Sequence, residues 1–283
     1  LKLERDFMVG YSPEREDPNN PDFTSGNIPK VVGSTSPEGL EVVQNLYDQI
    51  VSKTVPVPSV EVAEATKLME NIFRAVNIAL VNELKIAFEK MGIDIWEVIE
   101  GSKTKPFGFM PFYPGPGLGG HCIPIDPFYL SWKAKQYGVN TRFIELAGEI
   151  NRAMTDHVVM RVMEALSDQD KPLKGANIHI LGLAYKPNVD DDRESPSYYL
   201  MEQLEQRGAI VTYHDPHIPV IRPSRSFAKF AGRKSTGLNG IHDLVLIVTA
   251  HDEYADIDFY GLNIPVVDTR NIVAGKFDLL YKA

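Results

Sequence analysis

The only cysteine of the chain lies in its most unusual segment, PFYPGPGLGGHCIPIDP at residues 111–127. Cys122 comes shortly before Asp126 and Pro127, which could cap and start a helix. A thiolate near a helix N-terminus is stabilised. We therefore predict that Cys122 is a nucleophile, against the alternative that a lone cysteine is a small buried hydrophobic residue. The adjacent His121 is expected to be a loop residue without a role.

The glycines of this segment match the dinucleotide-binding spacing in letters only. Gly115, Gly117 and Gly120 give G-x-G-x-x-G. That motif binds a pyrophosphate only where it joins a strand to the start of a helix. Here proline and aromatic residues precede the glycines, so we reject the match. Because glycine permits close approach, the spacing instead predicts a loop that closes tightly over a ligand.

A polar pair follows one face of the strongest predicted helix, which runs from about Val60 to Met91. Lys67 and Asn71 are four residues apart and share that face, to which Asn82 returns three turns later. A Lys/Asn pair could polarise or deprotonate a hydroxyl and hold a water molecule. The alternative is a solvated helix face.

Charged residues follow the first predicted strand, Phe7–Tyr11. The segment Ser12–Pro18 contains Glu14 and Arg15. Loops at strand ends are favoured ligand positions in α/β folds. The alternative is an acidic surface turn.

A second charged loop follows the predicted strand Asn177–Leu183. It carries Lys186 and Arg193, and Ser195 with Pro196 fits the cap and first turn of a following helix. Cations at the carboxyl end of a strand, beside a helix N-terminus, suit phosphate. Because the glycine fingerprint is missing, we expect a pyrophosphate held by side chains rather than by backbone.

Two patterns describe the elements that position these residues. Helical periodicity dominates up to residue 166, and a linker-like stretch follows at Ser167–Gly175. Short apolar runs then alternate with helical or polar segments, which predicts βαβ units and a doubly wound parallel sheet. The sequence therefore predicts an α/β protein with a helical part before the sheet.

Composition limits the possible classes of function. The 283 residues are 43% hydrophobic, too apolar for disorder, and the formal charge of −9 argues against a nucleic-acid surface. No apolar run approaches the roughly 20 residues of a membrane span. One cysteine cannot close an intrachain disulfide, so a cytoplasmic setting is expected.

Three motifs around the single cysteine carry a resemblance to a known family. They are Gly119-Gly120-x-Cys122-x-Pro124-x-Asp126, Lys67-Leu-x-x-Asn71, and Lys186 with Arg193 seven residues later. The chain resembles the UDP-glucose/GDP-mannose dehydrogenase family, and most closely its UDP-N-acetylglucosamine (or N-acetylmannosamine) 6-dehydrogenase branch. The likeness covers essentially the whole chain.

The resemblance implies NAD-dependent four-electron oxidation of the C6 hydroxyl of a UDP-sugar to a uronic acid. The thiol would capture the aldehyde as a thiohemiacetal, which is oxidised to a thioester and hydrolysed. The implied catalytic residues are Cys122, Lys67, Asn71, Asp126 and Glu14; the implied substrate-binding residues are Arg15, Phe112, Tyr113, Gly115, Gly119 and Lys186; and Arg193 would bind the cofactor.

Two departures from the family pattern qualify these expectations. Ile125 stands where the family commonly has a lysine, so a cofactor contact from that lysine is missing. The N-terminal NAD domain also has no counterpart, so we expect a truncated chain that does not turn over substrate alone. The predicted ranges are 1–58 for a remnant of the NAD domain, 59–166 for a helical central (dimerisation) domain, and 167–283 for a Rossmann-like nucleotide-sugar domain.

Several alternatives stay open at this point. The chain could be a non-catalytic UDP-sugar-binding and dimerisation fragment, or a hydrolase using a Cys/His pair. The sugar could be glucose, N-acetylglucosamine or N-acetylmannosamine. We expect a homodimer or higher homo-oligomer, no bound metal, and no nucleic-acid or membrane partner.

Overall fold

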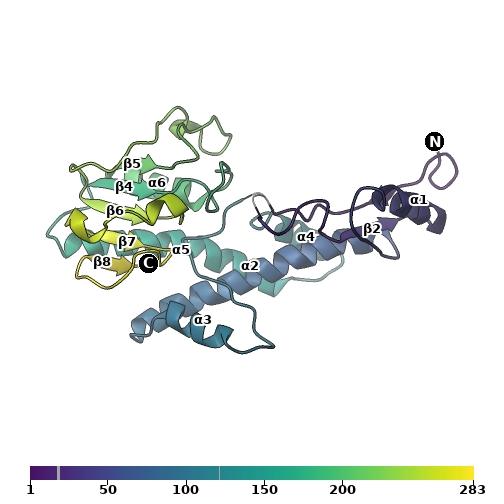
Figure 1. Ribbon diagram of the computed structural model, residues 1–283, viewed down its shortest axis with the longest axis horizontal. Helices are drawn as coiled ribbons and strands as arrows, with labels where there is room; N and C mark the ends of the chain where they lie inside the picture. The colour runs from purple at the N-terminus through teal and green to yellow at the C-terminus, as the bar shows by residue number, and fades with distance from the viewer. Residues whose placement is uncertain (18–19, 121) are drawn as a thin grey trace. The chain divides into compact units, whose positions relative to one another are not determined.

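A computed structural model of the chain describes residues 1–17, 20–120 and 122–283 and divides the chain into two compact units, residues 1–74 and 75–283. Figure 1 labels most of the helices and strands, which are numbered in chain order. Among the described residues, no helix is long and apolar enough to cross a membrane. The domain ranges expected from the sequence divide the chain differently, and they stay a prediction.

The first unit is built on a three-stranded sheet. Strand β2 (Lys30–Ser34) lies between β1 (Gly10–Tyr11), to which it is antiparallel, and β3 (Thr54–Pro56), to which it is parallel. Helix α1 (Pro37–Tyr47) packs against β2, and the Ser36 side chain caps its N-terminus by accepting from the Gly39 amide at 3.1 Å.

The first predicted strand, at residues 7–11, is wrong in length. The structure pairs only Gly10 and Tyr11 with β2, whereas Phe7 forms an isolated bridge with Leu3. Residues 1–10 are exposed, so their apolar side chains have no sheet face to cover. Apolar character alone therefore overstated this strand.

Helix α2 (Val60–Lys90) confirms the long helix predicted from the sequence and runs through the boundary between the two units. It ends at Lys90, two residues before Gly92, whose φ of 73° lies in the left-handed region that glycine adopts readily. The Ile93 amide then bonds back to the Phe88 carbonyl at 2.9 Å, a Schellman-type end. Helix α3 (Ile95–Lys103) follows at once, capped by the Asp94 carboxylate on the Trp96 amide at 2.9 Å.

The second unit contains a five-stranded parallel sheet. Its strands are β4 (Asn177–Leu181), β5 (Ile210–His214), β6 (Leu244–Ile247), β7 (Val266–Asp268) and β8 (Leu280–Lys282), and their spatial order is β5-β4-β6-β7-β8. The arrows in Figure 1 follow that order. The chain moves from β4 outward to β5 and then returns to the other side of β4 to form β6. The direction in which strands are added therefore reverses between β4 and β6. Ligands of such sheets bind at the carboxyl ends of the strands beside this switch point.

Both faces of the sheet are covered. In β6, Leu244 and Leu246 face one hydrophobic core, whereas Val245 and Ile247 face the other. The first core is completed by helices α5 (Arg142–Ser167) and α6 (Pro196–Gln206), while α4 (Asp126–Lys135) packs on α5. An apolar run buried on both faces is typical of a parallel sheet, and the predicted α/β class is confirmed.

The connections after β5 differ from the predicted alternation of strands and helices. In the segments that connect β5, β6, β7 and β8, the only helical elements among the described residues are the short 3-10 turns η1 (Ala228–Phe230), η2 (Asp252–Tyr254) and η3 (Tyr260–Leu262). Aromatic residues of these turns, such as Phe230 and Tyr254, are fully buried and pack on the sheet. Short aromatic turns thus cover the surface that longer helices would otherwise cover.

Candidate active site

Cys122 is exposed and forms no disulfide, which contradicts the alternative of a small buried hydrophobic residue. Its carbonyl accepts from the amides of Ile125 at 3.2 Å and Asp126 at 2.9 Å, so the residue opens a turn that leads into α4. The expectation that Asp126 caps this helix is wrong. Ile125 occupies the cap position, and Asp126 already lies in the first turn because its own amide is bonded four residues back.

Two residues of the sequence-based reading lie outside the described residues. They are His121, next to the thiol, and Pro18, at the end of the first charged loop.

Gly119 and Gly120 bring the cysteine loop against the loop that follows β4. A Cβ atom on Gly119 would lie 2.6 Å from Cβ of Tyr185 and 3.0 Å from Cδ of Pro196. Gly120 has a φ of 82°, and its amide donates to the Arg193 carbonyl at 2.9 Å. The described residues directly before these glycines, 104–114, form no strand, which agrees with rejecting the dinucleotide motif. Because these glycines have no side chain, the backbone of the cysteine loop can instead lie directly against the loop that follows β4.

Arg193 lies next to the cysteine loop, because its carbonyl accepts from the Gly120 amide. Its guanidinium is held by Asp191, with Nε 2.9 Å from Oδ1 and Nη2 2.6 Å from Oδ2. Partial burial alone would raise the pKa of the Asp191 carboxyl, but hydrogen bonds from Arg193 outweigh it and lower that pKa. Asp191 raises the pKa of Arg193, and the nearby Cys122 thiol adds a smaller contribution in the same direction.

The predicted cap of α6 is confirmed. Ser195 occupies the cap position, its side chain accepts from the Ser197 amide at 3.2 Å, and Pro196 begins the helix. Lys186 lies half-buried in the loop before them. The structure therefore brings Cys122, Gly119 and Arg193 together and places Lys186 in the loop that contacts them.

The opposite end of the glycine loop is anchored by buried amides. The Gly115 amide donates to Oδ1 of Asn82 at 3.0 Å, and Nδ2 of Asn82 donates to Oδ1 of Asn151 at 2.9 Å. Nδ2 of Asn151 in turn donates to the Ala75 carbonyl at 3.1 Å. Both asparagines are buried, so this chain of bonds fixes Gly115 against α2 and α5. The sequence indicated Asn82 but not Asn151, which lies 69 residues away.

Arg270 is a cation that the sequence analysis missed. It follows β7, donates from Nε to the Val248 carbonyl at 2.8 Å, and is so close to Gly115 that a Cβ there would overlap its guanidinium. Burial lowers the pKa of Arg270 to about 10, so it stays charged at neutral pH. A signal was available, since the arginine comes two residues after a buried strand at the edge where ligands bind.

The aromatic residues of the loop have structural partners. Tyr113 stacks on Trp96 with ring centroids 5.5 Å apart, and its hydroxyl donates to Glu100 at 2.9 Å. Phe112 packs against a small core that includes Ile95. Their predicted contact with substrate stays a prediction.

A cavity of about 430 Å³ lies behind the cysteine loop, between α4, α5 and the start of α6. Ile123, Phe128 and Tyr199 give it a mostly apolar wall, with Arg152 at its polar side. Cys122 is not among the described residues that line it. We therefore do not assign this cavity to the reacting sugar.

Asp215 fills the position where a dinucleotide-binding fold would hold a pyrophosphate. Its Oδ2 accepts from the amides of Leu183 and Ala184, at 2.7 and 2.8 Å, directly after β4. Its Oδ1 accepts from the amides of His217 and Ile218. Because these backbone donors are already used by a carboxylate, this turn offers no cradle to a dinucleotide.

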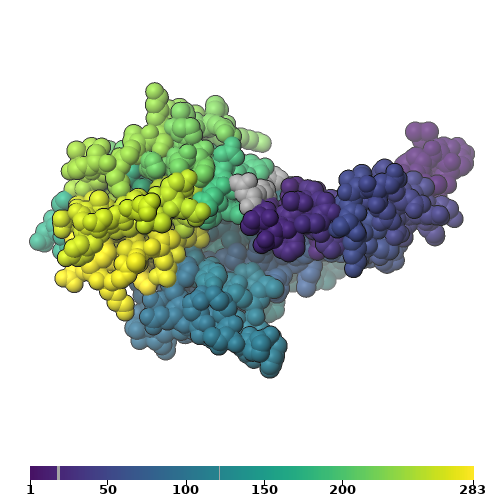
Figure 2. All heavy atoms as spheres, in the orientation of Figure 1, coloured from purple at the N-terminus to yellow at the C-terminus, as the bar shows by residue number. Residues whose placement is uncertain are grey.

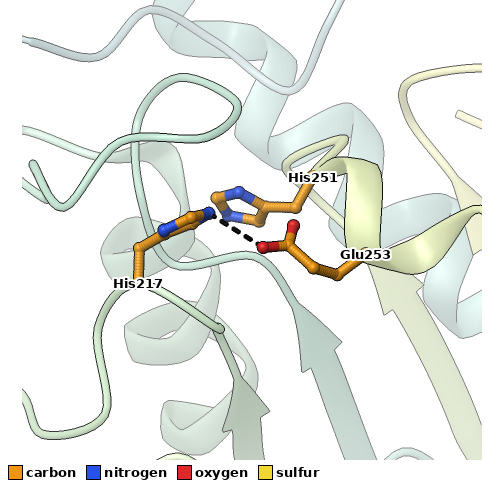
Figure 3. A group of neighbouring side chains, drawn as sticks. All are labelled: His217, His251 and Glu253. Atoms are coloured by element: carbon orange, nitrogen blue, oxygen red, sulfur yellow. Dashed lines mark ion pairs between the residues drawn. The ribbon is translucent and has the colours of Figure 1, made fainter. Parts of the chain in front are cut away.

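Three side chains near Asp215 resemble a metal-binding group, His217, His251 and Glu253. Figure 3 shows His217 pointing at Glu253, with 3.4 Å between Nε2 and the carboxylate. Both ring nitrogens of His251 are engaged: Nδ1 accepts from the Asn188 amide and Nε2 faces Asp215, each at 3.0 Å. We therefore interpret the group as an ion pair beside a buried Asp–His pair.

Glu14 and Arg15 belong to the first unit. The Glu14 carboxylate lies 3.0 Å from Nζ of Lys30 and accepts from two backbone amides. Partial burial opposes these bonds, but together they lower the pKa of Glu14. Arg15 pairs with Glu70 of α2 at 2.8 Å. Glu14 and Arg15 are therefore held by ion pairs with residues of β2 and α2 in the same unit.

Lys67 and Asn71 also lie in the first unit, on α2. Asn71 is only 2% exposed, so the alternative of a solvated helix face is wrong for this residue. Lys67 is half-buried. Their predicted catalytic roles stay predictions.

Comparison with known families gives two matches. Residues 61–153 match the UDP-glucose/GDP-mannose dehydrogenase family, central domain, and residues 179–275 match the UDP binding domain of the same family. Together the matches cover more than half of the chain.

Individual relatives agree with these matches. The chain is 38% identical to Protein CapL of Staphylococcus aureus over 89% of its length, and 34% identical to the UDP-N-acetyl-D-glucosamine 6-dehydrogenase of Pseudomonas aeruginosa over 91%. It spans 59% and 60% of those two proteins. The solved UDP-D-ManNAc dehydrogenase of Pyrococcus horikoshii superposes on 99% of the chain with a TM-score of 0.87 at 28% identity, and 66% of that protein is covered.

Proposed function

Because the chain belongs to the UDP-glucose/GDP-mannose dehydrogenase family, we propose that it carries the sugar-nucleotide site and the nucleophilic thiol of an NAD-dependent UDP-sugar 6-dehydrogenase. The observation that carries this proposal is the exposed Cys122 at the end of a glycine loop. That loop is anchored by Asn82 and Arg270 at one end and pressed against the Arg193 loop at the other.

The proposed reaction has four steps, which are oxidation of the alcohol, addition of the thiol, a second oxidation and hydrolysis. Carbon C6 gives a hydride to the proposed acceptor, NAD, and its hydroxyl loses a proton, which leaves an aldehyde. The thiol of Cys122 adds to that carbonyl, forming a C–S bond while its proton passes to oxygen. The thiohemiacetal loses a second hydride and a proton to become a thioester. Water then breaks the C–S bond, which releases the acid and returns the thiol.

The described residues divide this work in the following way. Arg270 and Lys186 supply positive charge for the diphosphate, and Gly115 and Gly119 line the substrate site where the loop packs closely on Arg270 and Tyr185. Arg193 offsets negative charge that develops beside the thiol. The remaining roles rest on the resemblance alone: Lys67 and Asn71 at the hydroxyl, Asp126 and Glu14 in proton transfer, Arg15, Phe112 and Tyr113 at the substrate.

NAD is the proposed acceptor of both hydrides. The described residues offer no backbone cradle for its pyrophosphate, since Asp215 occupies the turn after β4 and the glycines of the cysteine loop follow no strand. The predicted contact between Arg193 and the cofactor therefore remains a proposal without a surrounding dinucleotide site. Only the sugar, thiol and water steps are assigned to residues of this chain.

We propose a UDP-N-acetylhexosamine rather than UDP-glucose as the sugar. Support comes from the relatives, whose names specify N-acetyl-D-glucosamine, N-acetyl-D-mannosamine and N-acetyl-D-galactosaminuronic acid. Assembly as a homodimer through the helical part is likewise a proposal.

Calorimetry on the 283-residue chain tests the assignment. We expect binding of UDP-N-acetylglucosamine or UDP-N-acetylmannosamine, with UDP-glucose weaker and Cys122→Ala binding as well as the wild type. Failure of every UDP-sugar to bind would contradict the proposal. NAD binding with formation of NADH would favour the complete reaction.

A second candidate, a UDP-sugar-binding module without its own cofactor site, is favoured by one observation. The amides of Leu183 and Ala184 are already used by Asp215. Binding of UDP-sugar with no binding of NAD would favour this candidate for the chain in isolation.

A further inference from the structure

A second cavity in the larger unit lies away from the cysteine loop. It has a volume of about 410 Å³ and is enclosed by the end of α2, the start of α3, α5 and β8. In Figure 2 the yellow C-terminal residues lie next to the blue-teal residues around α3. The bond between Nζ of Lys282 and Asp94, 2.6 Å long, joins these two segments. We call this space the Lys85 cavity.

Cations outnumber carboxylates in its lining. Its charged side chains are Lys85, Arg161, Lys276 and Lys282 against Glu89 and Asp94, so the lining has an excess of two positive charges. The whole chain carries a formal charge of −9, so this excess is local and opposite in sign to the average surface.

The two carboxylates are already committed to other partners. Asp94 binds Lys282 and also caps α3 through the Trp96 amide. Glu89 lies 3.1 Å from Nε of Arg161 and 3.4 Å from Nε2 of His157. Neither acid is therefore free to neutralise a further cation fully.

Lys85 is a buried cation whose ion-pair partner is distant. Its side chain is 4% exposed, and among the described residues the only carboxylate within 4.0 Å of its Nζ is Glu89, at 3.8 Å. That distance is too long for a hydrogen bond. Burial outweighs the attraction of Glu89 and lowers the pKa of Lys85. A buried ammonium with no close anion is costly, and an anion in the cavity would offset that cost.

Lys276 adds a second cation at the edge of the same cavity. It is exposed, and in the part of the chain that the structure describes it forms no ion pair. One cation is thus buried inside the cavity and another is positioned at its entrance.

Apolar groups complete the lining. Trp96, Phe277 and Leu280 provide a surface that a bare inorganic ion would not cover. Small-molecule sites commonly combine an apolar wall with a few placed charges, in cavities of about 300–1,000 Å³. Trp96 also stacks on Tyr113 of the glycine loop, so it links this cavity to that loop.

We propose that the Lys85 cavity binds a small organic oxyanion, with its phosphate or carboxylate on Lys85 and Lys276 and its apolar group against Trp96. The proposal is independent of the proposed dehydrogenase function, because it concerns other residues and needs no turnover. Through Trp96 and Tyr113, an occupant would contact the element that supports the glycine loop.

Calorimetry with three probes tests the proposal: phenyl phosphate, benzoate and inorganic phosphate. We expect phenyl phosphate or benzoate to bind more tightly than inorganic phosphate, and the tighter of the two identifies the anionic group. Lys85→Met keeps the length of the side chain and removes the charge, so it should weaken that binding by about tenfold or more. Lys186→Met, which removes a cation beside the cysteine loop, should leave it unchanged.

Other outcomes overturn the proposal. No binding of either organic probe in the millimolar range would do so, as would binding that Lys186→Met abolishes and Lys85→Met preserves. If Lys85→Met does not fold, the exposed substitution Lys276→Ser decides, because it should weaken binding several-fold without disturbing the core. Unchanged binding in Lys276→Ser would then refute the proposal.

Discussion

The two ends of the glycine loop are held in opposite ways. At Gly115 the loop is fixed by buried groups, namely the two amides of Asn82 and Asn151 and the guanidinium of Arg270. At Gly120 it is held by one backbone bond to Arg193, next to the exposed Cys122. The first end suits recognition, which needs a fixed backbone. The second suits chemistry, which needs an accessible thiol.

Removing the buried anchor should have the largest effect on stability. Asn82→Ala leaves the Gly115 amide and Oδ1 of Asn151 without their partners, at a cost of about 1–3 kcal/mol for each buried unsatisfied group. Urea denaturation should therefore show a loss of about 2–6 kcal/mol. The exposed Asn45→Ala is the control, expected within about 0.5 kcal/mol of the wild type.

The double variant Asn82→Ala/Asn151→Ala refines this result. Because the two residues share one network, the double variant should lose clearly less than the sum of the single losses. Additive losses would show that the two amides act separately and would contradict the anchor.

Filling the packed glycine should have an intermediate effect. Gly119→Ala places a methyl group against Tyr185 and Pro196, and overpacking of this kind costs about 1–3 kcal/mol. The displacement of the loop should also weaken UDP-sugar binding, measured by calorimetry. Gly101→Ala is the matched control, since no atom lies within 4 Å of its added Cβ and alanine favours helix α3 by up to about 1 kcal/mol. Equal behaviour of the two variants would contradict the close packing.

Loosening the exposed end should have the smallest effect on stability. Asp191→Asn weakens the hold on Arg193, whose side chain is 65% exposed, so the loss at neutral pH should stay below about 1 kcal/mol. UDP-sugar binding or turnover should change more than the melting temperature does. A large loss of stability with normal binding would show that the pair is structural only.

The pH dependence of this pair has a defined sign. The folded-state pKa of Asp191 is lowered, so its contribution is fully present above the ordinary value of 3.8 and is lost as the pH falls through the lower folded value. Wild type and Asp191→Asn should therefore converge in stability at acidic pH and differ most near neutrality. Melting curves from acidic to neutral pH measure the difference, and curves that diverge as the pH falls would contradict the sign.

Patterns local in the chain predicted much of this structure. The periodicity of apolar residues predicted the end of α2 to within one residue. The pair Ser195-Pro196 predicted where α6 begins. Glycine density around Cys122 predicted a loop that closes over a ligand. The structure shows Gly119 packed closely on Tyr185 and Pro196, and closure over a ligand stays a prediction. Each of these signals depends on neighbours in sequence.

The residues that were missed depend on contacts between distant segments. Asn151 acts on Gly115 only through Asn82, and Asp215 reaches the turn after β4 from the end of β5. Arg270 meets Gly115 only because the sheet brings the end of β7 to the glycine loop. The spacing of residues along the chain does not predict such long-range contacts. A polar residue directly after a buried strand is nevertheless a useful indication of a site.

Alkylation of Cys122 tests the central claim most directly, because the chain has one cysteine and intact mass reports a single site. The rate of modification by iodoacetamide would be measured with UDP-N-acetylglucosamine or UDP-N-acetylmannosamine, and with UDP alone. At ten times its dissociation constant, the sugar nucleotide should slow alkylation by about tenfold, since only the free fraction reacts. UDP, which lacks the sugar, should protect much less. A UDP-sugar that binds by calorimetry yet leaves the alkylation rate unchanged would contradict the placement of the reacting sugar at Cys122.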